Sequence, residues 1–312
     1  MSPNARAAPT RAAPTRAAAT HPPTIRPAPA PATGSVGPLL RGWRERRRVS
    51  QLELALTADS SARHISFIEN GRSRPSREMV LRLAEHLDVP LRDRNALLVA
   101  AGYAPAYRES SFHDPDDPGM AAVRTAVDQL LRAHEPYPAV VLDATHDVVA
   151  ANSGMALLLD GVPERLLRPP LNLIRLALHP DGLAPRIVNF GQVRRHLLDR
   201  VERHLALWDT EPLRRLHTEV SRYPAPDPAP APDPAPTPGA DHHHAPDEHP
   251  AAAAVALPVR LRTATGELSF VSTIATFNSP LDVAVSELAI EMFLPADPAT
   301  ADAVRRRRPA TG

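Results

Sequence analysis

The distribution of proline is the feature that most limits how this chain can fold. Of the 37 prolines among 312 residues, 19 lie in two stretches, residues 1–38 and 224–250. Proline has no backbone N–H and a fixed φ, so such stretches do not build packed helices or sheets. We therefore expect a disordered Pro/Ala/Arg tail at 1–38 and a disordered Pro/His-rich insert at 224–254. The remaining residues are enough for two ordinary domains.

Cysteine content and charge exclude some kinds of functional site and favour others. The chain has no cysteine, which excludes disulfides, thiolate zinc sites and cysteine nucleophiles. Its net charge of +1 conceals an asymmetry, because residues 1–103 carry +8 and residues 104–312 carry −7. A basic front half predicts a polyanionic partner. No window holds the roughly 18 uncharged apolar residues of a membrane span, so we expect no membrane partner.

Residues 39–103 are predicted to form an all-α domain of five helices. Residues 50–53 (Ser-Gln-Leu-Glu) match a capping box, so a helix starts at Gln51. The next helix is expected at 62–69, because Asn70-Gly71 suits a left-handed helix end. Two short helices joined by a tight turn in a basic unit are typical of a helix-turn-helix. The other helices are expected from Leu39 to Arg48, between Pro75 and Pro90, and over 91–101.

The back half is predicted to be an α+β domain at 119–304. It follows a Pro/Asp-rich linker at 104–118 and precedes a basic tail at 305–312. Alternating apolar residues predict two hairpins, at 139–151 and 257–277, and a last strand from Val283 to Leu294. Helical patterns occupy 119–135, 153–159, 171–178, 186–208 and 211–222. Strands at both ends with helices between them are typical of α+β sensor domains.

Motifs in the front half resemble those of XRE-type (Cro/C1-like) helix-turn-helix regulators. The matching stretches are SQLELAL at 50–56, ISFIENGRSRPS at 65–76 and RLAEHLDVP at 82–90. One departure lies at the turn, where Asp59-Ser60 replaces the usual glycine and apolar residue. The resemblance implies binding to double-stranded DNA.

The back half resembles the PAS-like ligand-binding domain of MmyB-like regulators. The matching stretches are PAVVLDATHDVVAAN at 138–152, NLIRLALHPDGLAP at 172–185 and LSFVSTIATFNSPLDVAVSELAIEMFLPAD at 268–297. The resemblance implies a cytoplasmic bacterial regulator, associated with the nucleoid when bound to DNA, that pairs DNA binding with a pocket for a small hydrophobic, fatty-acid-like ligand. A homodimer on a two-fold DNA site is expected. The alternative is a C-terminal domain that binds no ligand and serves dimerisation or protein interaction.

The candidate base-reading residues lie on the helix expected at 62–69. Ile65 and Ile68 face inward on that helix, and the resemblance places Ala62, Arg63 and Phe67 at base-reading positions. A guanidinium can bind guanine O6 and N7 together, and apolar side chains can contact thymine methyls. For Arg63, a phosphate contact or plain solvation is the alternative.

Candidate phosphate contacts flank that helix. Ser50 and Gln51 lie at a helix N-terminus, where free N–H groups attract phosphate, although capping alone would also explain Ser50. Asn70, Arg72 and Arg74 follow the recognition helix and suit the DNA backbone. Arg44 and Glu69 match family positions that form an internal ion pair, so they are assigned to structure.

No cofactor, metal or enzymatic activity is expected. The histidine run at 242–244 invites a metal site, but a polyproline loop gives no scaffold to fix ligands. A triad could be drawn from Asp143, His179 and Asp181, yet no nucleophile elbow, phosphate loop or HExxH motif accompanies it. The sequence therefore predicts a sequence-specific transcription regulator with a C-terminal sensor domain.

Overall fold

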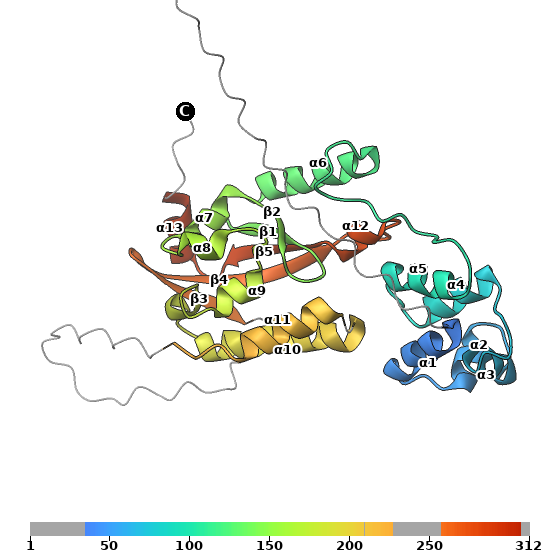
Figure 1. Cartoon of the computed structure of the whole chain (residues 1–312). Helices are drawn as coiled ribbons and strands as arrows, with labels where there is room; N and C mark the ends of the chain where they lie inside the picture. Colours follow the sequence, from blue (N-terminus) through green and yellow to red (C-terminus); the bar gives the residue numbers. More distant parts are fainter. Residues whose placement is uncertain (1–34, 209, 227–256, 307–312) are drawn as a thin grey trace, which may run out of the picture. The chain divides into compact units, whose positions relative to one another are not determined.

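The computed structural model describes residues 35–208, 210–226 and 257–306. Most of the expected N-terminal tail, most of the Pro/His-rich insert and the end of the basic tail lie outside these residues. The first five helices are α1 (Val36–Arg46), α2 (Gln51–Thr57), α3 (Ala62–Glu69), α4 (Arg77–His86) and α5 (Leu91–Ala100). They form the expected all-α unit (Figure 1).

Serine caps define the starts of three of these helices. The capping box of α2 is confirmed, because Ser50 Oγ accepts the Glu53 N–H at 3.1 Å and Glu53 accepts the Ser50 N–H at 3.4 Å. Ser61 and Ser76 cap α3 and α4 in the same way. The first helix begins at Val36 rather than Leu39, since Pro38 falls in its first turn, where no N–H is required.

The unusual turn between α2 and α3 keeps the helix-turn-helix geometry. Asp59 adopts a left-handed conformation with φ of 50°, which is the conformation that glycine usually supplies. Aspartate tolerates this region better than most residues. The departure from the family turn therefore preserves its backbone path.

The second domain is built on one antiparallel sheet with the strand order β2-β1-β5-β4-β3. The two expected hairpins are confirmed, and Gly266 closes the second one with φ of 125°. The strands are β1 (Ala139–Leu142), β2 (Val148–Ala151), β3 (Pro258–Thr263), β4 (Gly266–Thr276) and β5 (Ala289–Pro295). This sheet, with the helices around it, confirms the α+β class.

One predicted strand is partly wrong. The run from Val283 to Leu294 begins as a short helix, α12 (Val283–Glu287), and only then becomes β5. Asp282 Oδ1 accepts the Ala284 N–H at 2.9 Å and so caps this helix, overriding the β preference of the valines. The other helices are α6 (Pro118–Ala133), α7 (Ala156–Leu159), α8 (Glu164–Leu167), α9 (Leu173–Leu178), α10 (Phe190–Trp208), α11 (Glu211–Ser221) and α13 (Pro298–Arg306), with 3-10 turns η1 (Ser153–Met155) and η2 (Ala184–Arg186).

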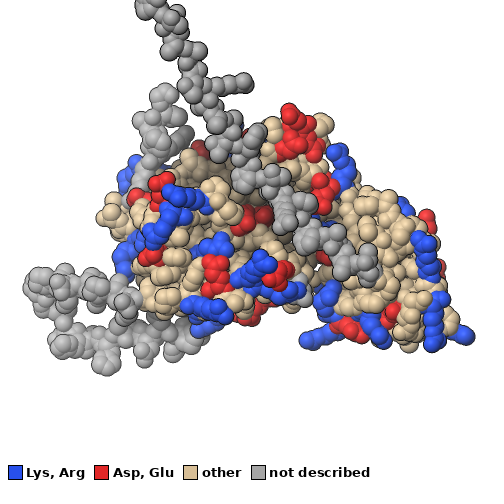
Figure 2. Space-filling model, viewed as in Figure 1, with Lys and Arg blue, Asp and Glu red and all other residues tan. Residues whose placement is uncertain are grey.

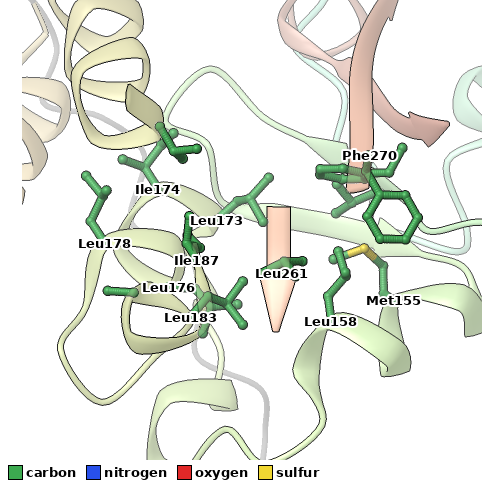
Figure 3. Close-up of a cluster of buried hydrophobic side chains, with 14 of the residues drawn as sticks. Met155, Leu158, Leu173, Ile174, Leu176, Leu178, Leu183, Ile187, Leu261 and Phe270 are labelled. Carbon is green, nitrogen blue, oxygen red and sulfur yellow. The ribbon is translucent and has the colours of Figure 1, made fainter. Parts of the chain in front are cut away.

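Helices cover both faces of the sheet. Alternation along β1 directs Ala139 and Val141 toward α6, and Val140 and Leu142 toward the larger core. In that core Phe270 of β4 lies with leucines and isoleucines of α9 and with Leu183 and Ile187, which flank η2 (Figure 3). Helices α10 and α11 lie side by side along the same face (Figure 1). The larger core therefore lies between this face, called the inner face of the sheet, and helices α9 to α11.

We predict that Ile65→Ala destabilises the helical domain by about 2–5 kcal/mol, because Ile65 is fully buried and the change leaves a cavity. The matched control is Leu56→Ala, which should cost less than about 0.5 kcal/mol because Leu56 is 74% exposed. Urea unfolding followed by Trp43 fluorescence measures the free energy of unfolding of this domain. A Trp208→Phe background removes the other tryptophan. Equal losses for both variants would contradict the assigned core.

Candidate functional site

The outer face of α3 carries the candidate base-reading residues. Ile65 and Ile68 are buried, whereas Arg63 is exposed and Ala62 and Phe67 are partly exposed. The Arg63 guanidinium lies over the Phe67 ring, 5.2 Å from its centroid. Such a cation–π contact limits where the long side chain can point. The structure thus brings Arg63 and Phe67 together on the helix expected from the sequence, whereas Ala62 packs partly against the core of the domain.

A buried ion pair supports α3 from the inside. Arg44 Nε of α1 donates to Glu69 Oε1 at 2.6 Å, and Gln51 Nε2 of α2 donates to Glu69 Oε2 at 2.8 Å. Burial alone would raise the pKa of Glu69, but the bonds from Arg44 and Gln51 outweigh it and hold that pKa below its ordinary value. The internal pairing expected for Arg44 and Glu69 is confirmed.

The candidate phosphate contacts differ in how much of each side chain is available. Ser50 is engaged in its cap and the Gln51 amide in Glu69, so the start of α2 offers mainly backbone N–H groups. Asn70 Nδ2 donates to the Ser66 carbonyl at 2.8 Å. Arg74 Nε donates to the Ala101 carbonyl at 3.0 Å, which directs it toward the end of α5.

Arg72 is the most available of the predicted phosphate contacts, because its side chain is exposed after α3. Figure 2 shows further arginines along the margin of the helical domain. Arg48, whose side chain is exposed, lies two residues before the Ser50 cap of α2. It was not among the sequence-based candidates, although its place beside a helix N-terminus was a usable signal.

The second domain holds a polar cluster that sequence reasoning missed. Arg200 of α10 and Glu291 of β5 are 7% and 5% exposed, and Arg200 Nη1 donates to Glu291 Oε2 at 2.8 Å. Four residues further along α10, the His204 ring stacks on the His146 ring with centroids 4.9 Å apart and planes 9° apart. Trp208 then meets His204 edge-on at 4.7 Å. A helix places residues four apart on one face, which was the only available signal.

His146 is held by the hairpin between β1 and β2. Its φ of 65° is left-handed, which is uncommon for a residue other than glycine. Asp143 Oδ1 accepts the Thr145 and Asp147 N–H groups at 2.8 and 2.9 Å. Asn172 Nδ2 donates to the Thr145 carbonyl and to Asp147 Oδ1, both at 2.8 Å. The turn is therefore braced from two sides.

Both histidines are neutral at neutral pH. Burial lowers the pKa of His146 to about 3, and the positive charge of Arg200 contributes further. Burial and Arg200 likewise lower the pKa of His204 to about 4. Because Arg200 is paired with Glu291, the cluster as a whole carries no net charge.

The residues that could be drawn as a triad have separate structural tasks. Asp143 braces the hairpin, and Asp181 accepts from Arg165 at 2.5 Å while its N–H reaches His179 Nδ1 at 3.0 Å. Within residues 35–208, 210–226 and 257–306 no cluster of three or more His, Asp or Glu could hold a metal. The histidine run at 242–244 lies outside the described residues. No helix in the described part is long and apolar enough to cross a membrane.

Comparison with known families defines the class of protein. The family described as "MmyB-like transcription regulator ligand binding domain" matches residues 123–306, and a helix-turn-helix family matches residues 40–93. The first match covers more than half of the chain, so the chain belongs to the MmyB-like transcription regulators. It is a DNA-binding transcription regulator, in agreement with the resemblances in both halves.

Comparisons with individual proteins add less. No curated protein matches this chain. The clp gene regulator ClgR from Corynebacterium glutamicum is 25% identical, with a TM-score of 0.20, over 34% of this chain and 95% of its own. An RNA-binding Light-Oxygen-Voltage receptor is 13% identical, with a TM-score of 0.23, over 89% of this chain but only 63% of its own. Similarity this low carries no argument about function.

We predict that the second domain loses stability as the pH falls below 6.5. The unfolded chain protonates His146 near its ordinary pKa of 6.5, whereas the folded chain does so only near pH 3. Between these values the unfolded state binds the extra proton, so His146 alone lowers the free energy of unfolding by about 1 kcal/mol per pH unit as the pH falls, and His204 adds to this decline. Calorimetry between pH 7 and 5 measures this slope.

The matched variant is His146→Phe, which keeps an aromatic ring against His204 and removes the titrating group. Its stability should depend less on pH than that of the wild type. A parallel decline of the two proteins over this pH range would contradict a buried neutral His146.

Proposed function

We propose that the chain is a sequence-specific regulator that reads double-stranded DNA with α3, acts as a homodimer, and senses a small ligand with its C-terminal domain. One observation supports DNA reading above the others. Arg63 is exposed and the Phe67 ring beneath it is partly exposed, on a helix fixed from behind by Glu69. An aromatic ring on an exposed helix face gains little in a free domain, but it fits a groove.

Arg63 is the residue proposed to read a base pair. Its guanidinium can donate two hydrogen bonds to guanine O6 and N7 in the major groove. Phe67 and Ala62 can contact thymine methyl groups beside it. Stacking on Phe67 limits the conformations of Arg63, so less side-chain entropy is lost on binding.

Phosphate contacts would hold the domain on the duplex. We assign them to the α2 start at Ser50 and Gln51, to Arg72, and with smaller shares to Asn70 and Arg74, whose donors are used within the domain. Such contacts position a protein without specifying sequence. A homodimer would place two α3 helices about 34 Å apart, one turn of DNA. Acting on a bacterial chromosome places the protein in the cytoplasm, at the nucleoid.

The ligand proposed for the second domain is small and partly apolar, with fatty-acid-like molecules as the first class to test. The family match supports a ligand-binding role, and the aliphatic interior of the domain supports an apolar ligand. The alternative is a ligand-free dimerisation or protein-interaction module. No catalytic activity is proposed, because both matched families are domains of transcription regulators.

We predict that Arg63→Ala loses discrimination at one base pair of each half-site, by about 1–3 kcal/mol. Arg63→Lys should keep the charge and most of the affinity for random DNA. It should lose the preference for guanine, because lysine cannot form the bidentate hydrogen bonds of a guanidinium. Affinity is measured for an operator selected from a random DNA pool, for its single-base variants and for random DNA.

The comparison variant is Arg72→Ala. It should weaken binding to all sequences alike and reduce the salt dependence by about one phosphate contact. If Arg63→Ala instead behaves like Arg72→Ala, with one common loss on every sequence, Arg63 contacts a phosphate and the base-reading assignment is wrong.

We predict that native mass spectrometry of the purified protein shows dimers that carry a bound small molecule, released on denaturation. Gentle ionisation keeps noncovalent ligands in place, so the mass difference identifies what the domain binds. Dimers of bare chain mass, with unchanged DNA binding, would favour the ligand-free dimerisation module instead.

A further inference from the structure

Unsatisfied hydrogen-bonding atoms in the second domain point to a place for a ligand. In the described residues, four buried side-chain atoms have no hydrogen-bond partner, and two of them are His146 Nε2 and His204 Nδ1. These two rings are stacked on each other. His146 is only 2% exposed, so water does not compensate for the missing partner. A buried polar atom without a partner is costly and calls for an explanation.

The surroundings of the two histidines form a built site. His146 is held in a left-handed turn by Asp143 and Asn172, and His204 lies between Arg200 and Trp208 on one face of α10. Strained, well-braced backbone is typical of functional positions. The hairpin and the helix thus present two imidazoles that their own domain does not use.

The buried charges beside this pair already have partners. Arg200 forms an ion pair with Glu291. The carboxylate of Asp147, next to His146 in the hairpin, accepts a hydrogen bond from the Asn172 amide. Arg203, whose charge also reaches His204, has its side chain exposed to solvent. An anionic head group in contact with His146 would therefore lose its hydration and would have to compete with Glu291 for the buried Arg200 guanidinium.

An apolar surface adjoins the polar cluster. Ile274 of β4 is the cross-strand partner of Glu291 on β5, so both side chains lie on the inner face of the sheet. Ile274 is nevertheless 50% exposed, directly beside the buried carboxylate. The apolar part of a ligand would cover this side chain while its polar end reaches the histidines.

We propose that His146 and His204 bind the polar head group of the ligand of this domain, and that this head group enters without net charge. The proposal rests on the ligand-sensing part of the proposed function. A neutral imidazole offers one donor and one acceptor, and its tautomer can adapt. Primary amides and un-ionised carboxylic acids present a donor and an acceptor side by side, so they match two imidazoles. An acid then enters together with one proton.

The test compares two probes of equal length, octanamide and octanoate, by titration calorimetry with the full chain at pH 8 and pH 6. Octanamide should bind equally at both values. Octanoate should bind more weakly at pH 8 and gain about a hundredfold toward pH 6, because its binding takes up a proton. Buffers with different ionisation enthalpies report that proton directly.

Variants locate the binding site. His146→Phe should lose at least about tenfold in octanamide affinity, while His146→Gln, which restores a donor and an acceptor, should recover part of it. Arg203→Gln should leave both probes unaffected. Unchanged melting of His146→Phe at pH 8, where His146 is neutral in the folded and the unfolded chain, and unchanged DNA affinity show that the protein remains folded.

Three results would overturn the proposal. If octanoate binds at pH 8 as tightly as octanamide and depends on Arg203, the head group is charged. If His146→Phe retains full affinity, the site lies elsewhere. If neither probe binds, an uncharged amide or acid head group is refuted. In each case native mass spectrometry still decides separately whether the domain carries a ligand, so the proposed function stands or fails on its own.

Discussion

The buried pair of Arg44 and Glu69 is the interaction on which the DNA-binding domain depends. One carboxylate joins three helices, since Arg44 reaches it from α1 and Gln51 from α2, while Glu69 itself belongs to α3. Removing one partner of a buried pair leaves an uncompensated charge and costs about 3–5 kcal/mol. The orientation of α3, which carries Arg63, and the position of the α2 start are therefore set by the same contact. A substitution of Glu69 would therefore be expected to change both the stability of the domain and the orientation of α3.

The second domain also contains a buried pair of arginine and glutamate, but there it lies beside two neutral histidines. Arg200 and Glu291 join α10 to the sheet and cancel each other's charge. Burial and the nearby guanidinium then keep His146 and His204 neutral, so the interior of the domain is polar without being charged. The ligand site proposed at the two histidines would select by hydrogen bonding and shape rather than by charge. That property separates it from the arginine-rich surface of the first domain, which attracts phosphates over a distance.

Local signals in the sequence predicted most of the fold. The capping box at Ser50 defined the start of α2, because caps act between neighbouring residues and need no tertiary context. The prediction of a strand from Val283 was partly wrong because it overlooked another local cap. Asp282 caps a short helix there and outweighs the β preference of the following valines. The histidine pair was not predictable, because His146 and His204 meet only after the hairpin folds onto α10. Likewise, nothing local showed that Arg74 is directed to the Ala101 carbonyl.

The central claim is that α3 reads base edges in the major groove, and methylation protection tests it most directly. Dimethyl sulfate modifies guanine N7 in the major groove and adenine N3 in the minor groove, so the pattern reports which groove is occupied. The account predicts protected guanine N7 atoms in two half-sites about one helical turn apart, with the protected guanine in each half-site reactive again in Arg63→Ala. Protection confined to adenine N3, or guanine protection unchanged in Arg63→Ala, would contradict it.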